Sequence, residues 1–337
     1  MIRASRILLA VGCLACTVAA VRSPAADEPK PKPKKVVVSD PKDLKDDKDY
    51  TIQGEYEGTR GDSKLGAQVV AKGEGKFSVK ILTGGLPGAG WDGKSEVIAE
   101  AKLGEDGTAT ITGRNTLGTI GGGKLTLDGG KSPPDRTLKR VERTSTTAGA
   151  KAPEGADVLF AEPGDESKWA GGKIIELSDG KYLNRGIRTK KLYGSFKAHI
   201  EFRLPWMPGS SGQGRGNSGF YLQDRYELQI LDSFGLKGEN NECGGIYTLH
   251  KPSVNMCLPP MVWQTYDIDF TAAAFDGDKK SKPARVTVLH NGVKIHDDVE
   301  LKNSTGGGKP ESGEPGAIQL QDHGDPVVFR NAWIISK

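Results

Sequence analysis

The sequence is poor in the residues that build metal centres and membrane spans. Its 337 residues include only four cysteines and five histidines, and outside the N-terminal apolar run, which holds Cys13 and Cys16, no Cys-x-x-Cys or His-x-x-x-His spacing occurs. A zinc site of the usual kind is therefore not indicated. The longest apolar run, from Ile7 to Val21, is about 15 residues, whereas a membrane-spanning helix needs ~20. A polytopic membrane protein is excluded.

The chain also lacks a large excess of either positive or negative charge. Forty-seven Lys and Arg oppose 43 Asp and Glu, which gives a net charge of +4. Three of these positive charges, Arg3, Arg6 and Arg22, lie in the first 26 residues. The remainder is close to neutral, so no basic surface for nucleic acid is expected. Glycine, in contrast, is abundant at 46 residues, about twice the usual share of ~7%, which favours many turns between short strands.

The first 26 residues have the pattern of a secretory signal peptide. Two arginines precede the apolar run, and the small residues Ser23-Pro24-Ala25-Ala26 follow it. We therefore expect export to the periplasm or the extracellular space, and no transmembrane segment once the leader is removed. Cys13 and Cys16 lie inside this leader, but the residues before Cys13 match a lipid-attachment motif poorly, so a lipoprotein anchor is the less favoured alternative.

Two cysteines remain in the exported chain, Cys243 and Cys257, which are 14 positions apart. An even number of cysteines in an exported protein favours a disulfide, which here would stabilise the fold by ~3 kcal/mol. Two buried free thiols are the alternative.

The composition divides the rest of the chain into two domains and two linkers. Residues 27–49 are rich in Lys, Pro and Asp, and residues 144–155 in Thr, Ala, Gly and Pro, so both are interpreted as linkers. Between them, residues 50–143 alternate apolar and polar side chains in short segments separated by glycines. This pattern predicts a small all-β module of six or seven strands.

The second domain, residues 156–337, is also predicted to be all-β. From Phe196 to Leu204 apolar residues alternate strictly with charged ones, the period of a half-buried strand. The segments 263–270 and 284–290 follow the same rule, and 327–335 is predicted as a further strand that closes the chain. Asn291-Gly292 is typical of a type I′ hairpin turn. About a dozen short strands in this length favour a sandwich or jelly roll.

The densest polar motif runs from Arg215 to Asp232. Its glycines are not followed by Gly-Lys-Ser/Thr, which excludes a P-loop. Glu227 and Gln229 fall on one face of a strand, and Leu228 and Ile230 on the other. The segment is similar to the E-x-D-x-x-E strand of laminarinase-like glycoside hydrolases, but Gln229 stands where the middle Asp is expected and Asp232 where the last Glu is. A retaining pair of carboxylates ~5–5.5 Å apart is therefore disfavoured.

A second polar motif, Gln319 to Pro326, places Gln319, Gln321 and His323 on one strand face before a Gly-Asp-Pro turn. Histidine exchanges protons near neutral pH, which makes His323 a candidate acid or base. We expect His199, His290 and His296 at the surface, and leave the position of His250 open.

The motifs G-N-S-G, Y-E-L-Q-I-L-D and L-Q-D-H-G, with Cys243 to Tyr247 and Phe329 to Ile334 beside them, resemble those of the 3-keto-disaccharide hydrolase family over residues 156–337. The chain departs from the family pattern at Asp325 and Ala332. The resemblance implies an all-β fold, a concanavalin-like jelly-roll sandwich, preceded here by a smaller N-terminal all-β domain. It also implies a carbohydrate substrate and cleavage of 3-keto-glycosides by elimination followed by hydration, a 3-keto-glucoside 1,2-lyase and hydratase chemistry.

That reaction needs a base, an acid and a stabiliser for the enolate. On this hypothesis Glu227 and His323 form the acid–base pair, with Asp232 as a further catalytic carboxylate. Arg330 or Arg188 would stabilise the enolate oxygen. The predicted substrate-binding residues are Asn217, Gln229, Gln321, Tyr221, Arg188 and Arg330.

A set made of Glu227, Asp232 and His323 could also hold a divalent cation such as calcium, although no spacing demands one. Two other functions stay open: a carbohydrate-binding domain without catalysis, and a conventional laminarinase-like glycoside hydrolase, because sandwich folds host many functions. Turnover of a 3-keto-glycoside would distinguish the enzyme from the binding domain. Turnover of an unmodified glucan would indicate the conventional hydrolase.

Overall fold

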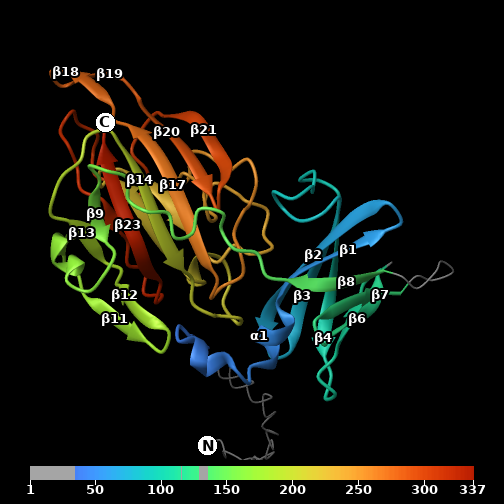
Figure 1. Cartoon of the computed structure of the whole chain (residues 1–337). Coiled ribbons are helices and arrows are strands. Elements are labelled where there is room, and N and C mark those ends of the chain that lie inside the picture. Colours follow the sequence, from blue (N-terminus) through green and yellow to red (C-terminus); the bar gives the residue numbers. More distant parts are fainter. Residues whose placement is uncertain (1–34, 115, 129–135) are drawn as a thin grey trace, which may run out of the picture. The chain divides into compact units, whose positions relative to one another are not determined.

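A computed structural model describes residues 35–114, 116–128 and 136–337, so the expected signal peptide and its two cysteines lie outside the described residues. Residues 35–337 form one compact unit. It contains a closed barrel and a two-sheet sandwich (Figure 1), so the predicted all-β fold is confirmed. No helix in the described part of the chain has the length and apolar character to cross a bilayer.

The barrel has eight antiparallel strands, where the sequence indicated six or seven. The first strand pairs with the last through Glu55 and Val141, which closes the sheet. Alternating apolar residues such as Val69, Val79 and Ile111 fill the interior. The strands are β1 Gly54–Arg60, β2 Ser63–Gly73, β3 Lys76–Thr83, β4 Glu96–Leu103, β5 Ala109–Thr112, β6 Leu117–Gly121, β7 Lys124–Leu127 and β8 Thr137–Val141.

The segment before the barrel, interpreted from sequence as a linker, contains two short helices where the structure describes it. These are η1, Pro41–Leu44, and α1, Lys48–Ile52. Asp47 caps α1 by accepting a hydrogen bond from the backbone N–H of Tyr50, and Leu44 packs into the barrel core.

The sandwich consists of a five-stranded sheet, in the order β10-β13-β22-β15-β16, and an eight-stranded sheet, in the order β11-β12-β23-β14-β17-β20-β21 with β9 paired to β23. A further hairpin, β18-β19, and the short helices η2 Asp165–Lys168 and η3 Gly212–Gly214 complete it. The strands of the five-stranded sheet are β10 Trp169–Ala170, β13 Ile187–Thr189, β22 Gln319–Leu320, β15 Ser218–Leu222 and β16 Tyr226–Ile230. The other strands are β9 Asp157–Phe160, β11 Ile174–Leu177, β12 Gly180–Leu183, β14 Phe196–Arg203, β17 Trp263–Thr271, β18 Ala274–Asp276, β19 Lys279–Lys282, β20 Ala284–His290, β21 Val293–Leu301 and β23 Val328–Ser336.

The main core lies between these two sheets. Phe196, Ile200 and Phe202 of β14 belong to the same buried cluster as Phe220 and Leu228 of the smaller sheet. The strand predicted from Phe196 matches β14 almost residue for residue, and Asn291 and Gly292 both have positive φ, as a type I′ turn requires. Each sheet therefore presents its other face away from this core, and the polar motifs lie on those faces.

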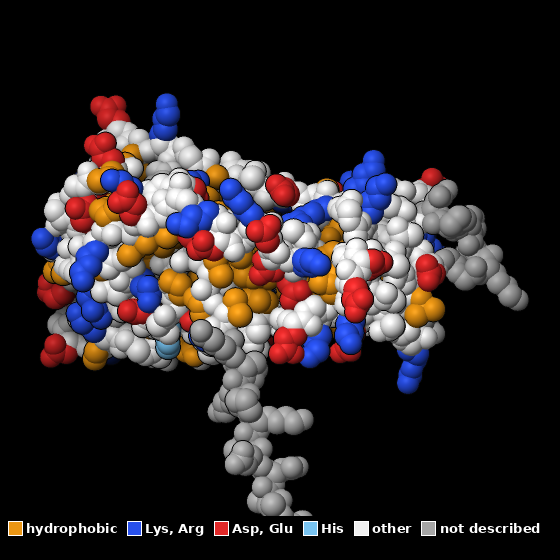
Figure 2. All heavy atoms as spheres, turned by 90° about the horizontal axis from the view of Figure 1, so that it is seen from below, with side chains coloured by type: hydrophobic (Ala, Val, Ile, Leu, Met, Phe, Trp, Pro, Cys, Tyr) orange, Lys and Arg blue, Asp and Glu red, His pale blue; other side chains and the backbone are white. Residues whose placement is uncertain are grey.

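Lys and Arg side chains are interspersed with Asp and Glu on the face of the molecule shown in Figure 2. No region of that face is dominated by positive charge, which agrees with the near-neutral composition.

Candidate active site

The outer face of the five-stranded sheet carries a row of polar residues. Strand register places Arg188 of β13 beside Gln319 of β22, Gln319 beside Tyr221 of β15, and Tyr221 beside Glu227 of β16. Because strand residues alternate between faces, the four side chains share one face while their neighbours enter the core. The next pair of residues on this face, two positions along the strands, is Gly219 and Gln229.

A hollow of about 250 Å³ lies over this face. Five of the predicted site residues line it: Tyr221, Glu227, Gln229, Gln321 and His323. The two polar motifs, which are about ninety residues apart in the sequence, therefore meet in one place. Its other lining residues are Gln213, Tyr247, Gly306 and Gly307.

Glu227 is the only carboxylate among the described residues that line the hollow. It is 3% exposed, and Tyr221 donates a hydrogen bond to its Oε2 at 2.9 Å. Burial raises the pKa of Glu227 to about 7, although the bond from Tyr221 opposes the shift. A carboxyl group with this pKa can both accept and release a proton near neutral pH.

Gly219 makes the position of Glu227 possible. A Cβ atom at residue 219 would lie 2.4 Å from Oε1 of Glu227, closer than real contacts allow. The last glycine of the G-N-S-G motif therefore provides space for the carboxyl group, and does not serve a turn.

The phenol of Tyr221 lies at the centre of the polar contacts in the hollow. Besides its 2.9 Å contact with Glu227, it lies 3.0 Å from the carbonyl oxygen of Gly306 and accepts a hydrogen bond from Nε2 of Gln321 at 3.2 Å. Burial and the neighbouring Glu227 carboxylate raise the pKa of Tyr221, so the phenol keeps its proton.

Gln229 and His323 differ in their surroundings. Gln229 is buried, and its Nε2 donates to Oε1 of Gln213 at 3.1 Å. His323 is exposed and lies in the turn after β22. The hollow thus combines a buried acid with an exposed imidazole and several amide groups.

The structure places Asp232 and Asn217 outside the lining of this hollow. Asp232 is buried and forms an ion pair with Arg215, with 2.5 Å between Oδ2 and Nε. It follows the end of β16, so it is not aligned with Glu227 and does not fit the predicted catalytic role. Asn217 contacts Gln213 through its Nδ2 at 2.8 Å and 3.2 Å, and so reaches the hollow only through that residue.

The two arginines predicted to stabilise an enolate do not line the hollow either. Arg188 is half exposed and is bonded to Asp224 and Gln319. Arg330 belongs to the other sheet, where its Nε donates to Glu201 at 2.7 Å. Asn331, with φ of 42°, lies at a bulge in β23 that changes which face the strand's side chains meet. The position of Arg330 does not fit the predicted role.

The metal-binding set proposed from sequence is not assembled. Asp232 is engaged by Arg215 and lies apart from Glu227 and His323, and the described residues contain no cluster of three His, Cys, Asp or Glu suited to a metal ion.

The predicted disulfide is not formed in the structure. Cys243 and Cys257 are both buried free thiols. The Sγ atom of Cys243 lies 3.2 Å from the hydroxyl oxygen of Tyr266. Tyr266 in turn donates to the carbonyl oxygen of Gln229 at 2.6 Å, so the thiols lie behind the strand that carries Glu227.

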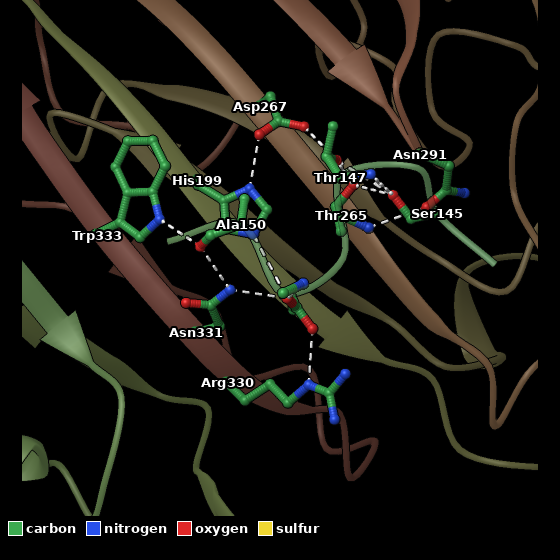
Figure 3. A network of polar contacts seen from close by, with 12 residues as sticks. Ser145, Thr147, Ala150, His199, Thr265, Asp267, Asn291, Arg330, Asn331 and Trp333 are labelled. Carbon is green, nitrogen blue, oxygen red and sulfur yellow. Dashed lines mark hydrogen bonds and ion pairs between the residues drawn. The ribbon is translucent and has the colours of Figure 1, made fainter. Parts of the chain in front are cut away.

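A second polar network covers the outer face of the eight-stranded sheet (Figure 3). Glu201 accepts hydrogen bonds from the backbone N–H of Gly149 at 2.6 Å, from Asn331 at 2.9 Å and from Arg330 at 2.7 Å. Burial alone would raise the pKa of Glu201, but the neighbouring His199 and these hydrogen bonds lower it to about 2.

The segment expected to link the two domains contributes to this network. Thr147 donates to Asp267 at 2.6 Å, and the carbonyl oxygen of Ala150 accepts hydrogen bonds from Asn331 and Trp333 (Figure 3). Residues 145–150 therefore bind along the sheet.

The prediction that three histidines lie at the surface is wrong. His199, His290 and His296 are at most 4% exposed. A hydrogen-bond partner at one ring nitrogen reduces the cost of burying each ring. The partners are Asp267 for His199, Gln264 for His290 and the carbonyl oxygen of Gly244 for His296. Burial lowers the pKa of His290 to about 3, so this ring is neutral. His250 is half-buried and contacts the carbonyl oxygen of Glu300.

Sequence reasoning missed four residues of the hollow: Gln213, Tyr247, Gly306 and Gly307. The run Thr305-Gly306-Gly307-Gly308 was a signal of a backbone that approaches another group closely, and Gly307 does have φ of 76°. Tyr247 ends the Cys243–Tyr247 motif of the family resemblance, but no residue of that motif was assigned to the substrate site. Tyr247 reaches the hollow because its backbone N–H bonds to the carbonyl oxygen of Glu227 at 3.0 Å.

These features define a concanavalin-like sandwich with a polar hollow on the outer face of one sheet. The model of the 3-keto-alpha-glucoside-1,2-lyase-like domain family matches residues 148–335, more than half of the chain. The chain belongs to this family. No curated protein matches it.

The solved structures that match include two of candidate glycosyl hydrolases from Parabacteroides distasonis. One is 32% identical, with a TM-score of 0.49, and the match covers 55% of this chain and 85% of the other. The second is 20% identical, with a TM-score of 0.38, and the match covers 55% of this chain and 94% of the other.

Proposed function

We propose that the protein cleaves 3-keto-glycosides by elimination and hydration, with Glu227 as the base. The observation that supports this most directly is a buried carboxyl group with a pKa of about 7 in a polar hollow of a domain from this family. A ketone at C3 acidifies the proton at C2, so a single well-placed base is sufficient to begin the reaction.

The proposed reaction begins with proton transfer and ends with the addition of water. Ionised Glu227 takes the C2 proton and an enolate forms. As the C1–O bond breaks, its electron pair leaves with the oxygen, and a double bond forms between C1 and C2. The departing oxygen takes a proton from an acid, for which we propose His323. Water then adds its hydroxyl to C1 and a proton to C2, which gives a free 3-keto sugar.

The surrounding amides would bind the sugar and the developing enolate oxygen. Gln213, Gln229 and Gln321 line the hollow, and the two arginines proposed from sequence do not. Stabilisation by neutral donors also leaves the raised pKa of Glu227 intact, because a cation beside it would lower that pKa.

A conventional retaining glycosidase fits the hollow less well. That mechanism needs two carboxyl groups ~5–5.5 Å apart. Glu227 is the only carboxylate among the described lining residues, and Asp232 is held by Arg215.

The test is turnover of a 3-keto-disaccharide, compared with its unoxidised parent. We expect release of sugar from the keto compound alone, and a loss of ~10²–10⁴-fold in Glu227→Gln, the range for a general base. Activity of the wild type should rise with pH through about pH 7, because the base must be ionised. Glu176→Gln, at an exposed position on β11, is the matched control and should retain full activity.

Three results would contradict the proposal. Unchanged activity in both Glu227→Gln and His323→Ala would exclude the assigned roles. Binding of glycan without turnover of either sugar would indicate a binding domain. Cleavage of the unoxidised parent would indicate a conventional hydrolase.

We also propose that the protein acts after export, since residues 1–26 have the pattern of a secretory leader. Expression of the full chain in a bacterial host should yield a periplasmic or extracellular product whose mass lacks the leader. A product that stays in the cytoplasm with an intact N-terminus would contradict export.

A further inference from the structure

The contacts of Tyr221 require more hydrogen atoms than its phenol has. Its oxygen lies 2.9 Å from Oε2 of Glu227 and 3.0 Å from the carbonyl oxygen of Gly306. A phenol has one hydrogen, and a carbonyl oxygen or an ionised carboxylate can only accept. If Glu227 is ionised, the two oxygens compete for the same hydrogen, and one of them loses its partner.

A proton on Glu227 resolves this competition. The carboxylic acid then donates to the oxygen of Tyr221, and Tyr221 donates its own hydrogen to Gly306. The second lone pair of the phenol oxygen accepts from Nε2 of Gln321 at 3.2 Å. Every hydrogen-bonding position of the phenol is filled in this state, as is usual for buried polar groups.

Gly306 lies in a loop that is fixed on both sides of its tip. The backbone N–H of Thr305 bonds to the carbonyl oxygen of Arg225, and the Thr305 hydroxyl oxygen accepts from the backbone N–H of Glu227 at 2.8 Å. On the other side, the backbone N–H of Lys309 bonds to the carbonyl oxygen of Asp224. Within the described residues, Tyr221 is the only side chain that hydrogen-bonds to Gly306 or Gly307, and these two glycines line the hollow.

We propose that Tyr221 couples the proton on Glu227 to the position of the Gly306–Gly307 tip. With Glu227 protonated, the phenol holds the tip over the hollow. With Glu227 ionised, the phenol turns its hydrogen to the carboxylate, and the tip loses the only side chain that holds it. Tyr221 is thus a positioning residue that acts through Glu227 and the loop.

The other groups around Glu227 do not provide an alternative switch of this kind. From the neighbouring elements, Tyr247 and His323 face the same hollow. Arg188 of β13 lies near Tyr221 but bonds to Asp224, as does Lys309 from the far side of the loop. None of these four has a hydrogen bond to Gly306 in the described structure, so none of them holds the tip directly.

The coupling has a consequence that rests on the proposed function. The free enzyme would carry ionised Glu227 and a released tip, which lets substrate enter with the base ready. Transfer of the C2 proton to Glu227 would then let the phenol fix the tip over the unsaturated intermediate. Loss of that proton would release the tip again for product exit.

The experiment is amide hydrogen exchange of the substrate-free protein, corrected for the intrinsic rates, between about pH 5.5 and about pH 8.5. The probe is the amide of Gly308, which bonds to the carbonyl oxygen of Thr305 directly after the tip. In the wild type its protection should fall about five- to tenfold as pH rises, the effect expected of one lost hydrogen bond. The midpoint should follow the carboxyl ¹³C shift of Glu227.

Three variants separate the contributions. Glu227→Gln stays neutral and its amide can still donate to Tyr221, so protection should be high at every pH. Tyr221→Phe removes the coupling, so protection should be low at every pH. His323→Gln should keep the transition of the wild type, which excludes the imidazole as its source.

Two results would overturn the proposal. One is protection that does not change while the Glu227 carboxyl group titrates. The other is a transition of unchanged size in Tyr221→Phe. Because no substrate is present, either result leaves the proposed reaction unaffected, and failure of turnover leaves this coupling unaffected.

Discussion

Glu227 and Glu201 are both buried glutamates on outward faces of the sandwich sheets, yet their pKa values shift in opposite directions. Glu227 is 3% exposed and has a pKa of about 7, whereas Glu201 is 0% exposed and has a pKa of about 2. The difference lies in their partners. Glu201 has His199, Asn331, the N–H of Gly149 and Arg330, whereas the carboxyl group of Glu227 has only the phenol of Tyr221 among the described residues.

Burial alone therefore does not identify a functional acid. It disfavours the charged form of both residues, and in Glu201 the hydrogen bonds and the cation reverse the effect. A fully bonded carboxylate holds the strands and the 145–150 segment together. A buried carboxyl group with few hydrogen-bond donors has a pKa near neutral pH and can exchange a proton there, which is the property that general acid–base catalysis needs.

The largest expected effect on stability is at Glu201. Glu201→Ala would leave three donors without their acceptor: the side chain of Asn331, the backbone N–H of Gly149 and the partly exposed Arg330. We therefore expect a loss of about 3–5 kcal/mol in the free energy of unfolding. Urea denaturation at neutral pH measures it, with the exposed Glu176→Ala as control. A loss no larger than that of the control would mean that the network does not stabilise the fold.

Substitution of Glu227, in contrast, is expected to stabilise the folded protein at high pH. The pKa of Glu227 is about 7 in the folded protein and near 4.5 when unfolded, so the folded state binds more protons between these values. Stability therefore falls as pH rises across this window. Glu227→Gln has no ionisable group at this position and avoids the loss. The free energy of unfolding of the variant minus that of the wild type should therefore increase by about 3 kcal/mol between about pH 4 and about pH 8. A pH-independent difference between the two proteins would contradict the raised pKa.

The space beside Glu227 can be tested with Gly219→Ala. The added Cβ would meet Oε1 of Glu227 at 2.4 Å, so we expect a stability loss of about 1–3 kcal/mol and reduced activity as the carboxyl group moves. Gly194→Ala is the matched control, because nothing lies within 4 Å of its added Cβ. Thermal unfolding and kcat/KM are the measurements, and equal behaviour of the two variants would refute the packing argument.

The smallest effect is predicted for Arg330→Gln. Arg330 is partly exposed, lies 4.1 Å over the Trp263 ring and is bonded to Glu201, so its loss should reduce stability by about 1 kcal/mol. Because it does not line the hollow, kcat/KM should change by less than about twofold. A loss of ~10²-fold or more, typical for removal of an oxyanion donor, would restore the role that the sequence suggested.

Local periodicity predicted more of the fold than of the site. The alternation from Phe196 identified β14, and Asn291-Gly292 identified the hairpin turn after β20, because each depends on residues next to one another. The same reasoning placed Glu227 and Gln229 on one face. The role proposed for Arg330 failed because β23 belongs to the other sheet, and the surface placement of His199 failed because its partner Asp267 comes from another strand.

The all-β character, the family and the outward direction of Glu227 and Gln229 follow from the order of amino acids alone. Which of the two buried glutamates has few hydrogen-bond donors depends on the tertiary structure. Strand pairing brings Tyr221 beside Glu227 and a distant glycine loop above it, whereas pairing in the other sheet gives Glu201 a full set of donors. The physical reason is that periodicity depends on neighbours in the chain, whereas the pKa of a buried group depends on neighbours in space.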